Sequence, residues 1–108
     1  MNGQQLKGHL DTLLMAVLEA GPAHGYAIIE SLRTSSQGLF DLPEGTIYPA
    51  LHRLESAGSV SSRRETVGGR ERRVYRLSAA GRRSLAQSRE SWHEFSGAVT
   101  RVLTAGTA

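Results

Sequence analysis

The apolar residues of the first twenty positions recur at helical spacing. They predict a helix over about residues 5–20 that ends at Gly21 and Pro22. The apolar stripe is wide for a helix with a single packing surface, so we expect one side to pack on its own domain and the other on a partner. Its members are Leu6, Leu10, Leu13, Leu14, Val17 and Leu18.

The next apolar positions predict a second helix over about residues 24–34, with Tyr26, Ile29 and Leu32 facing the core. A turn rich in serine and glycine follows this helix. Residues 39–42 are apolar enough for a short strand, which we expect before the third helix begins.

A third helix, over about residues 44–57, has two unlike faces. Ile47, Ala50, Leu51 and Leu54 fall together at helical spacing, so we expect this face in the core. The opposite face is small or polar and is free to contact another molecule. It consists of Gly45, Pro49, His52, Arg53 and Ser56.

The start of this third helix allows two arrangements. Thr46 could cap the helix with Pro49 in its first turn, or the helix could begin near Pro43 and bend. In both arrangements the amino-terminal turn is exposed.

Two β-prone runs follow, residues 59–67 and 72–77, with the turn glycines Gly68 and Gly69 between them. They predict a two-stranded hairpin with a basic tip. After the hairpin, Ser78 is expected to cap a long final helix.

The final helix extends over about residues 79–103 and has apolar residues at a seven-residue repeat. Such a repeat is typical of a helix that packs on another helix, and it predicts a homodimer. The repeating positions are Leu85, Trp92 and Val99, with Ser88, Phe95 and Val102 between them.

The net charge of +3 conceals an uneven distribution. Residues 63–83 contain eight arginines and two glutamates, a net charge of +6, whereas the rest of the chain carries −3. A local cluster of arginines is expected of a protein that binds a polyanion. A solvated hairpin without a ligand would have the same composition.

The composition narrows the class of protein. The 108 residues include no cysteine, which excludes disulfides and thiolate metal sites. Lys7, Asp11 and Glu19 interrupt the first apolar stretch, so it does not resemble a signal peptide or a membrane span. No repeat or linker divides the chain. We therefore expect one structural unit in the cytoplasm, without a membrane partner.

Catalysis would have to use the four histidines, which lie in separate segments without a nucleophile or a zinc-protease motif. We therefore expect no enzyme. A metal sensor has no ligand spacing in its favour. A protein-interaction module would have no need of a hairpin region with a net charge of +6, and salt-sensitive retention on duplex DNA would separate these alternatives. The histidines are His9, His24, His52 and His93.

Three helices followed by a basic hairpin are the element order of a winged helix-turn-helix. A helix fits the major groove, and a hairpin with arginines can reach the flanking phosphates. We predict a mainly α fold with a small β-hairpin. Residues 1–78 would bind DNA, and residues 79–108 would form a dimerisation helix in one structural unit with the amino-terminal helix.

Two stretches, GPAHGY and EGTIYPALHRLE, are specific motifs when they occur at this spacing. With them, the chain resembles the PadR-like transcriptional regulators, winged-helix proteins named after phenolic acid decarboxylase repressors. The resemblance covers residues 6 to about 103, and the single helix after the hairpin is similar to the short members of the family. Further similar stretches are LKGHLDTLLMAVL, GGRERRVYRLSAAGRRSL and Trp92 with Phe95.

The resemblance implies a homodimeric, sequence-specific regulator of transcription, commonly a repressor, that binds double-stranded DNA. A two-fold dimer predicts an inverted-repeat operator. The implied DNA-binding residues are Thr46, Tyr48, Pro49, His52 and Arg53 of the third helix and Arg63, Arg64, Arg70, Arg72 and Arg73 of the hairpin. The implied dimer interface comprises Leu6, Leu10, Leu14, Leu85, Trp92, Phe95, Val99 and Val102.

Some members of this family respond to phenolic acids or planar drug-like molecules bound at or near the dimer interface. Trp92 and Phe95 lie in the corresponding helix, so a small aromatic effector there is one interpretation. Packing of the same two rings within the interface is the other. The resemblance implies no cofactor and no metal.

Overall fold

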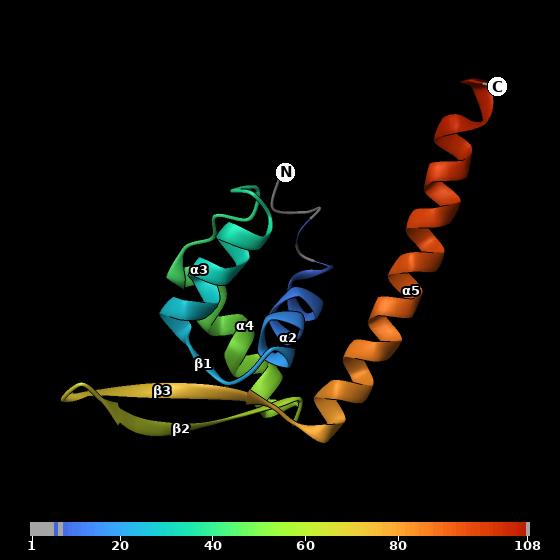
Figure 1. Cartoon of the computed structure of the whole chain (residues 1–108). Coiled ribbons are helices and arrows are strands. Elements are labelled where there is room, and N and C mark those ends of the chain that lie inside the picture. Colours follow the sequence, from blue (N-terminus) through green and yellow to red (C-terminus); the bar gives the residue numbers. More distant parts are fainter. Residues whose placement is uncertain (1–5, 7, 108) are drawn as a thin grey trace.

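The computed structural model describes residue 6 and residues 8–107. It is mainly helical with one small sheet, as predicted (Figure 1). The helices are α2 (Leu10–Glu19), α3 (Gly25–Ser35), α4 (Glu44–Ser56) and α5 (Ala79–Thr104), followed by the 3₁₀ turn η1 (Ala105–Thr107). The strands are β1 (Ala23–His24), β2 (Val60–Val67) and β3 (Arg70–Leu77).

The sheet is antiparallel with the strand order β1-β3-β2. Strands β2 and β3 form the predicted hairpin, in which Val60 pairs with Leu77 and Val67 with Arg70. Gly68 and Gly69 both have positive φ, 58° and 80°, which two-residue hairpin turns of this twist require.

Strand β1 was absent from the sequence prediction, because two residues are too few to show a period. It covers the free edge of β3, where Ala23 pairs with Tyr75 and His24 with Val74. The strand predicted at residues 39–42 is wrong. Phe40 and Leu42 instead pack on the core from an irregular loop.

The predicted first helix is interrupted, because Leu6 is helical but α2 begins only at Leu10. A turn at Gly8 and His9 precedes α2, and the His9 backbone N–H donates to the Leu6 carbonyl at 2.8 Å. Residue 5, the predicted start, lies outside the described residues.

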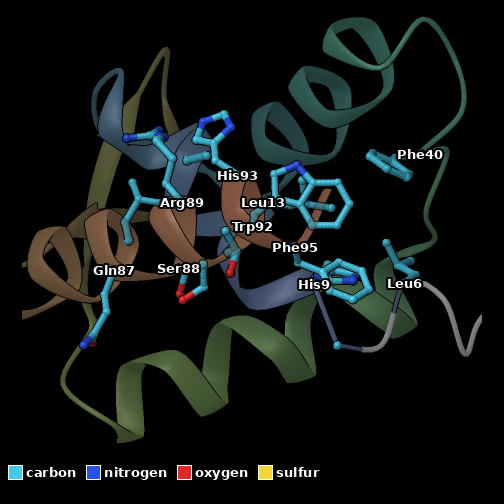
Figure 2. Close-up of a pocket in the computed structure, with 15 residues that line it drawn as sticks. Leu6, His9, Leu13, Phe40, Gln87, Ser88, Arg89, Trp92, His93 and Phe95 are labelled. Carbon is cyan, nitrogen blue, oxygen red and sulfur yellow. The ribbon is translucent and has the colours of Figure 1, made fainter. Parts of the chain in front are cut away.

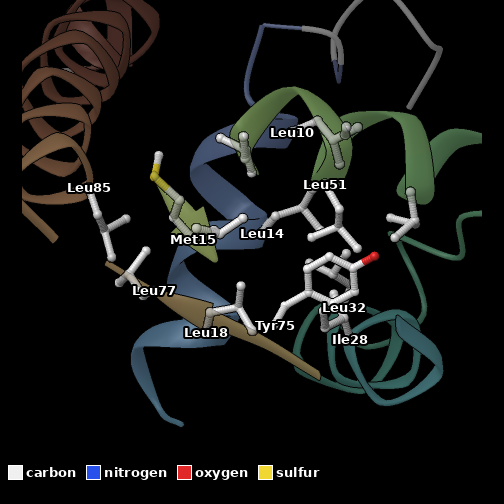
Figure 3. Packing of buried hydrophobic residues seen from close by; sticks show 14 residues of the cluster. Leu10, Leu14, Met15, Leu18, Ile28, Leu32, Leu51, Tyr75, Leu77 and Leu85 are labelled. Carbon is white, nitrogen blue, oxygen red and sulfur yellow. The ribbon is translucent and has the colours of Figure 1, made fainter. Parts of the chain in front are cut away.

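The core lies between α2, α3, α4 and the inner face of the sheet (Figure 3). The inward face of α3 differs from the prediction, because Tyr26 is 66% exposed and Ile28 is fully buried. Gly25 starts α3 in close contact with α4, so the residues three and seven positions later, Ile28 and Leu32, turn inward. The fully buried side chains are Leu14, Leu18, Ile28, Ile47, Leu51 and Leu85.

The first turns of α5 are fixed to the body of the protein. The Ser78 hydroxyl accepts a hydrogen bond from the Gly81 backbone N–H at 3.0 Å, which confirms the predicted cap. A Cβ on Gly81 would overlap the carbonyl oxygen of Ser59, so only glycine allows this approach. Leu85 then packs into the core beside α2.

The outer turns of α5 project from the body and give the protein an elongated shape of 60 × 28 × 21 Å (Figure 1). The outer part of α5 exposes five large apolar side chains, which we call the distal apolar face. They are Trp92, Phe95, Val99, Val102 and Leu103. None of the helices within the described ranges is both long enough and apolar enough to cross a bilayer.

Candidate nucleic-acid interface

Helix α4 is anchored by one face and exposed on the other. Ile47, Ala50, Leu51 and Leu54 are buried, as predicted. The helix begins at Glu44 with Pro43 as its N-cap residue, which is the second of the two predicted arrangements for the start. Its first turn is exposed at the surface, where unpaired backbone N–H groups and the helix dipole favour an anion.

The exposed face of α4 has two flanks with different neighbours. On one flank, Arg53 donates to the Asp11 carboxylate of α2 at 3.1 Å. On the other, Tyr48, His52 and Glu55 recur at helical spacing and face the sheet. Arg53 therefore points away from Tyr48 and His52, and Glu55, which was not among the predicted residues, joins these two on the flank that faces the sheet.

A cleft of about 650 Å³ separates this second flank from strand β3. Both elements contribute donors and rings to it. Its lining residues are Tyr48, Pro49, His52 and Glu55 of α4 and Arg73 and Tyr75 of β3. Burial raises the pKa of the Tyr75 hydroxyl above its ordinary value, so this phenol stays protonated.

The Tyr48 ring lies against the start of α3. A Cβ on Gly25 would overlap the Tyr48 hydroxyl and ring carbons. Gly25 is buried, whereas Tyr48 keeps 39% of its surface exposed. The glycine of the GPAHGY stretch thus makes room for the tyrosine of the EGTIYP stretch, which explains physically why the two motifs occur together.

The hairpin arginines divide between the two faces of the sheet. Side chains alternate along a strand, and the register places Arg64 and Arg73 opposite each other on the face that α4 covers. The remaining predicted arginines, Arg63, Arg70 and Arg72, project from the other face. The alternation of RRVYRL in the sequence already predicts that Arg73 and Arg72 lie on opposite faces, and the packing of α4 shows which of the two faces the helix shares.

Arginines on the face away from α4 contact groups of the sheet itself. Arg76 and Arg63 approach the Glu65 carboxylate at 2.7 and 3.3 Å, and Arg72 lies 3.3 Å from the His24 ring. Exposed ion pairs of this kind contribute little to stability, so they leave the arginines available to other anions.

Arg73 is held differently, by a chain of hydrogen bonds to α4. Its Nη1 donates to the Ser62 hydroxyl at 2.9 Å, and that hydroxyl donates to Glu55 Oε2 at 2.6 Å. Sequence analysis missed Ser62 and Glu55, although Glu55 lies seven residues after Tyr48 and thus on the same side of the helix.

The comparison with known proteins agrees with this geometry. The model of the transcriptional regulator PadR-like family matches residues 14–87, which include α3, α4 and the whole hairpin. The chain belongs to the PadR-like family of transcriptional regulators. Members of this family regulate transcription and are not enzymes, in accordance with the separation of the four histidines in the sequence.

Several relatives support the assignment to the PadR-like family. The transcriptional regulator Rv3488 of Mycobacterium tuberculosis is 41% identical over 71 residues, which are 66% of this chain and 64% of that protein. A transcriptional regulator of Clostridium thermocellum has a similar structure, with a TM-score of 0.84, 26% identity and coverage of 92% and 97% of the two chains. A PadR family regulator of Eggerthella lenta superimposes with a TM-score of 0.80 and 31% identity, covering 93% and 86%.

A second concave surface of this PadR-like protein lies between α2 and α5 (Figure 2). It is an open groove of about 860 Å³ with Trp92 and Phe95 along one side and Leu6, Leu13 and Phe40 along the other. Trp92 makes ring contacts with His9 at 5.2 Å and with Phe95 at 6.3 Å between centroids.

The dimer interface stays a prediction, but its eight residues fall into two groups. Leu6, Leu10, Leu14 and Leu85 are buried within the single chain, so they leave little surface for a partner. The other four predicted interface residues, Trp92, Phe95, Val99 and Val102, belong to the distal apolar face. A seven-residue repeat alone does not show which of its positions pack on the same chain.

An ion pair joins α5 to the carboxyl end of α2. Arg89 donates to both carboxylate oxygens of Glu19, at 2.9 and 3.3 Å. The hydrogen bond from Arg89 lowers the pKa of the Glu19 carboxyl, although some desolvation opposes this effect. The pair lies where α5 leaves the body, and it helps to set the direction of the helix.

Proposed function

We propose that this PadR-like protein is a cytoplasmic, homodimeric repressor that binds a specific sequence of double-stranded DNA. The observation that carries the proposal is the cleft between α4 and β3, which joins the exposed flank of a helix to an arginine of the hairpin. A helix in the major groove and a basic hairpin on the adjacent backbone would use both sides of this cleft.

Base recognition is assigned to the exposed face of α4. Thr46, Pro49 and His52 lie on this face or at its edges. Tyr48 lies at the edge of the face where α4 contacts Gly25 of α3. Two small residues, Gly45 near the start of α4 and Ser56 at its end, are also exposed on this side. A face of this shape suits close approach to base edges in the major groove.

Phosphate contacts are assigned to the hairpin, with Arg73 in the cleft beside α4 and Arg64 on the same face of the sheet. Arg63, Arg70 and Arg72 would extend the positive surface along the other face and at the tip. Phosphate contacts contribute affinity that depends on salt, whereas base contacts contribute specificity.

The distal apolar face supports the proposed homodimer. Five large apolar side chains on one exposed helix would leave a wide apolar surface in water if the chain were a monomer. A second copy of α5 can cover it, because a two-fold axis brings the same surface of each chain together. Residues 1–78 would then bind DNA, and residues 79–108 would join the two chains.

A two-fold dimer with one α4 per chain would bind an inverted repeat with half-site centres about 10 base pairs, or a multiple of one helical turn, apart.

The groove between α2 and α5 supports a second candidate function, the binding of a small aromatic effector beside Trp92 and Phe95. Such a ligand would weaken operator binding by the factor by which operator weakens ligand binding.

Selection of bound fragments from genomic DNA with the purified protein tests the proposal and supplies the operator. On that operator, His52→Ala should cost about 1 to 3 kcal/mol of specific binding and change binding to random DNA less. Arg73→Ala should weaken both and lower the salt slope by about one. Equal losses on operator and random DNA for both variants would contradict these assignments, and failure to select any fragment would contradict the proposed function.

A further inference from the structure

We propose that Ser62 and Glu55 are positioning residues that hold Arg73 in the cleft for one phosphate of the DNA backbone. This inference rests on the proposed function. It concerns the hydrogen bonds that run from Arg73 Nη1 to the Ser62 hydroxyl and from that hydroxyl to Glu55 Oε2, at 2.9 and 2.6 Å.

The chemistry of the three groups fixes the direction of this chain of hydrogen bonds. A guanidinium can only donate, and an ionised carboxylate can only accept. The single hydroxyl proton of Ser62 must therefore point to Glu55, which leaves a Ser62 lone pair for Arg73. The two hydrogen bonds polarise each other in the same direction, so each strengthens the other.

The arrangement leaves Arg73 ready for an anion. Only one of its five N–H groups is used by Ser62, and no carboxylate pairs with its guanidinium anywhere in residues 8–107. Tyr48 and His52 line the same cleft and can also donate to an oxygen. A phosphate in the cleft would thus meet donors from both elements.

Glu55 does not cancel the charge of Arg73 directly, because Ser62 lies between them. It acts as the fixed end of the chain of hydrogen bonds. Since Glu55 belongs to α4 and Arg73 to β3, the chain ties the proposed base-reading helix to the hairpin. An otherwise flexible arginine would lose less conformational entropy when the phosphate binds.

Two substitutions at residue 62 whose side chains have the same shape as each other test the inference. Ser62→Thr keeps the hydroxyl and Ser62→Val removes it, and both β-branched side chains suit a strand. We expect Ser62→Thr to bind the selected operator like the wild type. Ser62→Val should bind roughly 3- to 10-fold more weakly, as expected for one lost hydrogen bond, with an unchanged salt slope because Arg73 keeps its charge.

The decisive comparison repeats Ser62→Val in an Arg73→Ala background. There the substitution should change operator affinity by less than about twofold, since the residue that Ser62 positions is absent. Ser61→Val is the matched control, because its neighbouring side chain projects from the opposite face of β2. It should leave operator affinity unchanged, and urea unfolding of each variant checks that the fold is intact.

Equal operator binding by Ser62→Val and Ser62→Thr would overturn the inference, and so would the same loss from Ser62→Val with and without Arg73. Either result would leave the proposed function intact if the wild type still selects an operator. If the wild type itself shows no salt-dependent binding to duplex DNA, the proposed function fails and the inference fails with it.

Discussion

The body of this PadR-like protein and the outer part of α5 use apolar residues in opposite ways. In the body, leucines from α2, α3 and α4 meet one another and the inner face of the sheet. On the distal apolar face, side chains of similar size meet little of their own chain. Leu85 is 1% exposed and Trp92 is 47% exposed, although both belong to the same seven-residue repeat.

The difference shows that one helix can serve two purposes along its length. The first turns of α5 complete the core, and a serine cap and a glycine contact fix their position. Farther out, α5 contacts the body through the ion pair between Arg89 and Glu19 and through the ring contact of Trp92 with His9. We therefore expect substitutions near the base to change folding and substitutions farther out to change association.

The largest expected effect is on the core of the body. Leu14→Ala should lower the free energy of unfolding by about 2 to 5 kcal/mol, because Leu14 is fully buried and a cavity would remain. Urea unfolding measures this loss, and sedimentation equilibrium should give the folded variant an unchanged dimer dissociation constant. A weaker dimer would place Leu14 in an interface between chains, as the family resemblance implied.

The next effect concerns the distal apolar face. Trp92→Ala should weaken dimerisation by about 2 to 4 kcal/mol, since a buried aromatic ring is typical of an interface hot spot. Glu94→Ala is the matched control, because Glu94 is exposed and lies on the other side of the helix. Sedimentation equilibrium of both variants measures the change, and equal dissociation constants would remove Trp92 from the proposed interface.

Two glycines of α5, one at its base and one in its outer part, have different surroundings. Gly81→Ala should destabilise the fold by about 1 to 3 kcal/mol, because its Cβ would overlap the Ser59 carbonyl. Gly97→Ala should instead stabilise it by about 0.5 to 1 kcal/mol, since its Cβ would meet only the end of the Arg101 side chain, at 3.4 Å. Thermal unfolding distinguishes the two signs, and the same sign for both would contradict this description of α5.

The smallest effect concerns the ion pair at the point where α5 leaves the body. Arg89→Ala should raise the pKa of Glu19 toward its ordinary value of 4.5, as carboxyl NMR titration would show. Because the folded-state pKa is lowered in the wild type, the pair stabilises the protein above the unfolded-state pKa. That contribution disappears as the pH falls through the folded-state pKa. Arg101→Ala, in the same helix, should leave the titration of Glu19 unchanged.

The sequence predicted the elements in which a periodic pattern of apolar residues extends over many positions, or in which turn and cap residues mark an end. The helices, the hairpin with its two glycines, the Ser78 cap and the buried face of α4 follow from local spacing and turn chemistry. It could not predict strand β1, whose two residues form a strand only because β3 offers a free edge. The direction of Tyr26 depends on how closely Gly25 approaches α4, which is also a tertiary effect.

The sequence predicted which elements form the candidate site, but it did not predict which of their side chains face one another. The sequence identified both the helix and the arginine-rich hairpin. Which arginines share a face with α4, and that Arg53 turns toward Asp11, depend on register and packing. Glu55 and Ser62 have no special sequence context, and only their contact across the cleft makes them candidates.

The mass of the protein in solution shows whether the chain is a dimer. In the proposed dimer, the two copies of α5 cover each other's distal apolar face. Light scattering at micromolar concentration should therefore give the mass of two chains of 11.7 kDa each, and two chains should bind each inverted repeat. A folded, stable species with the mass of one chain, alone and on DNA, would contradict it.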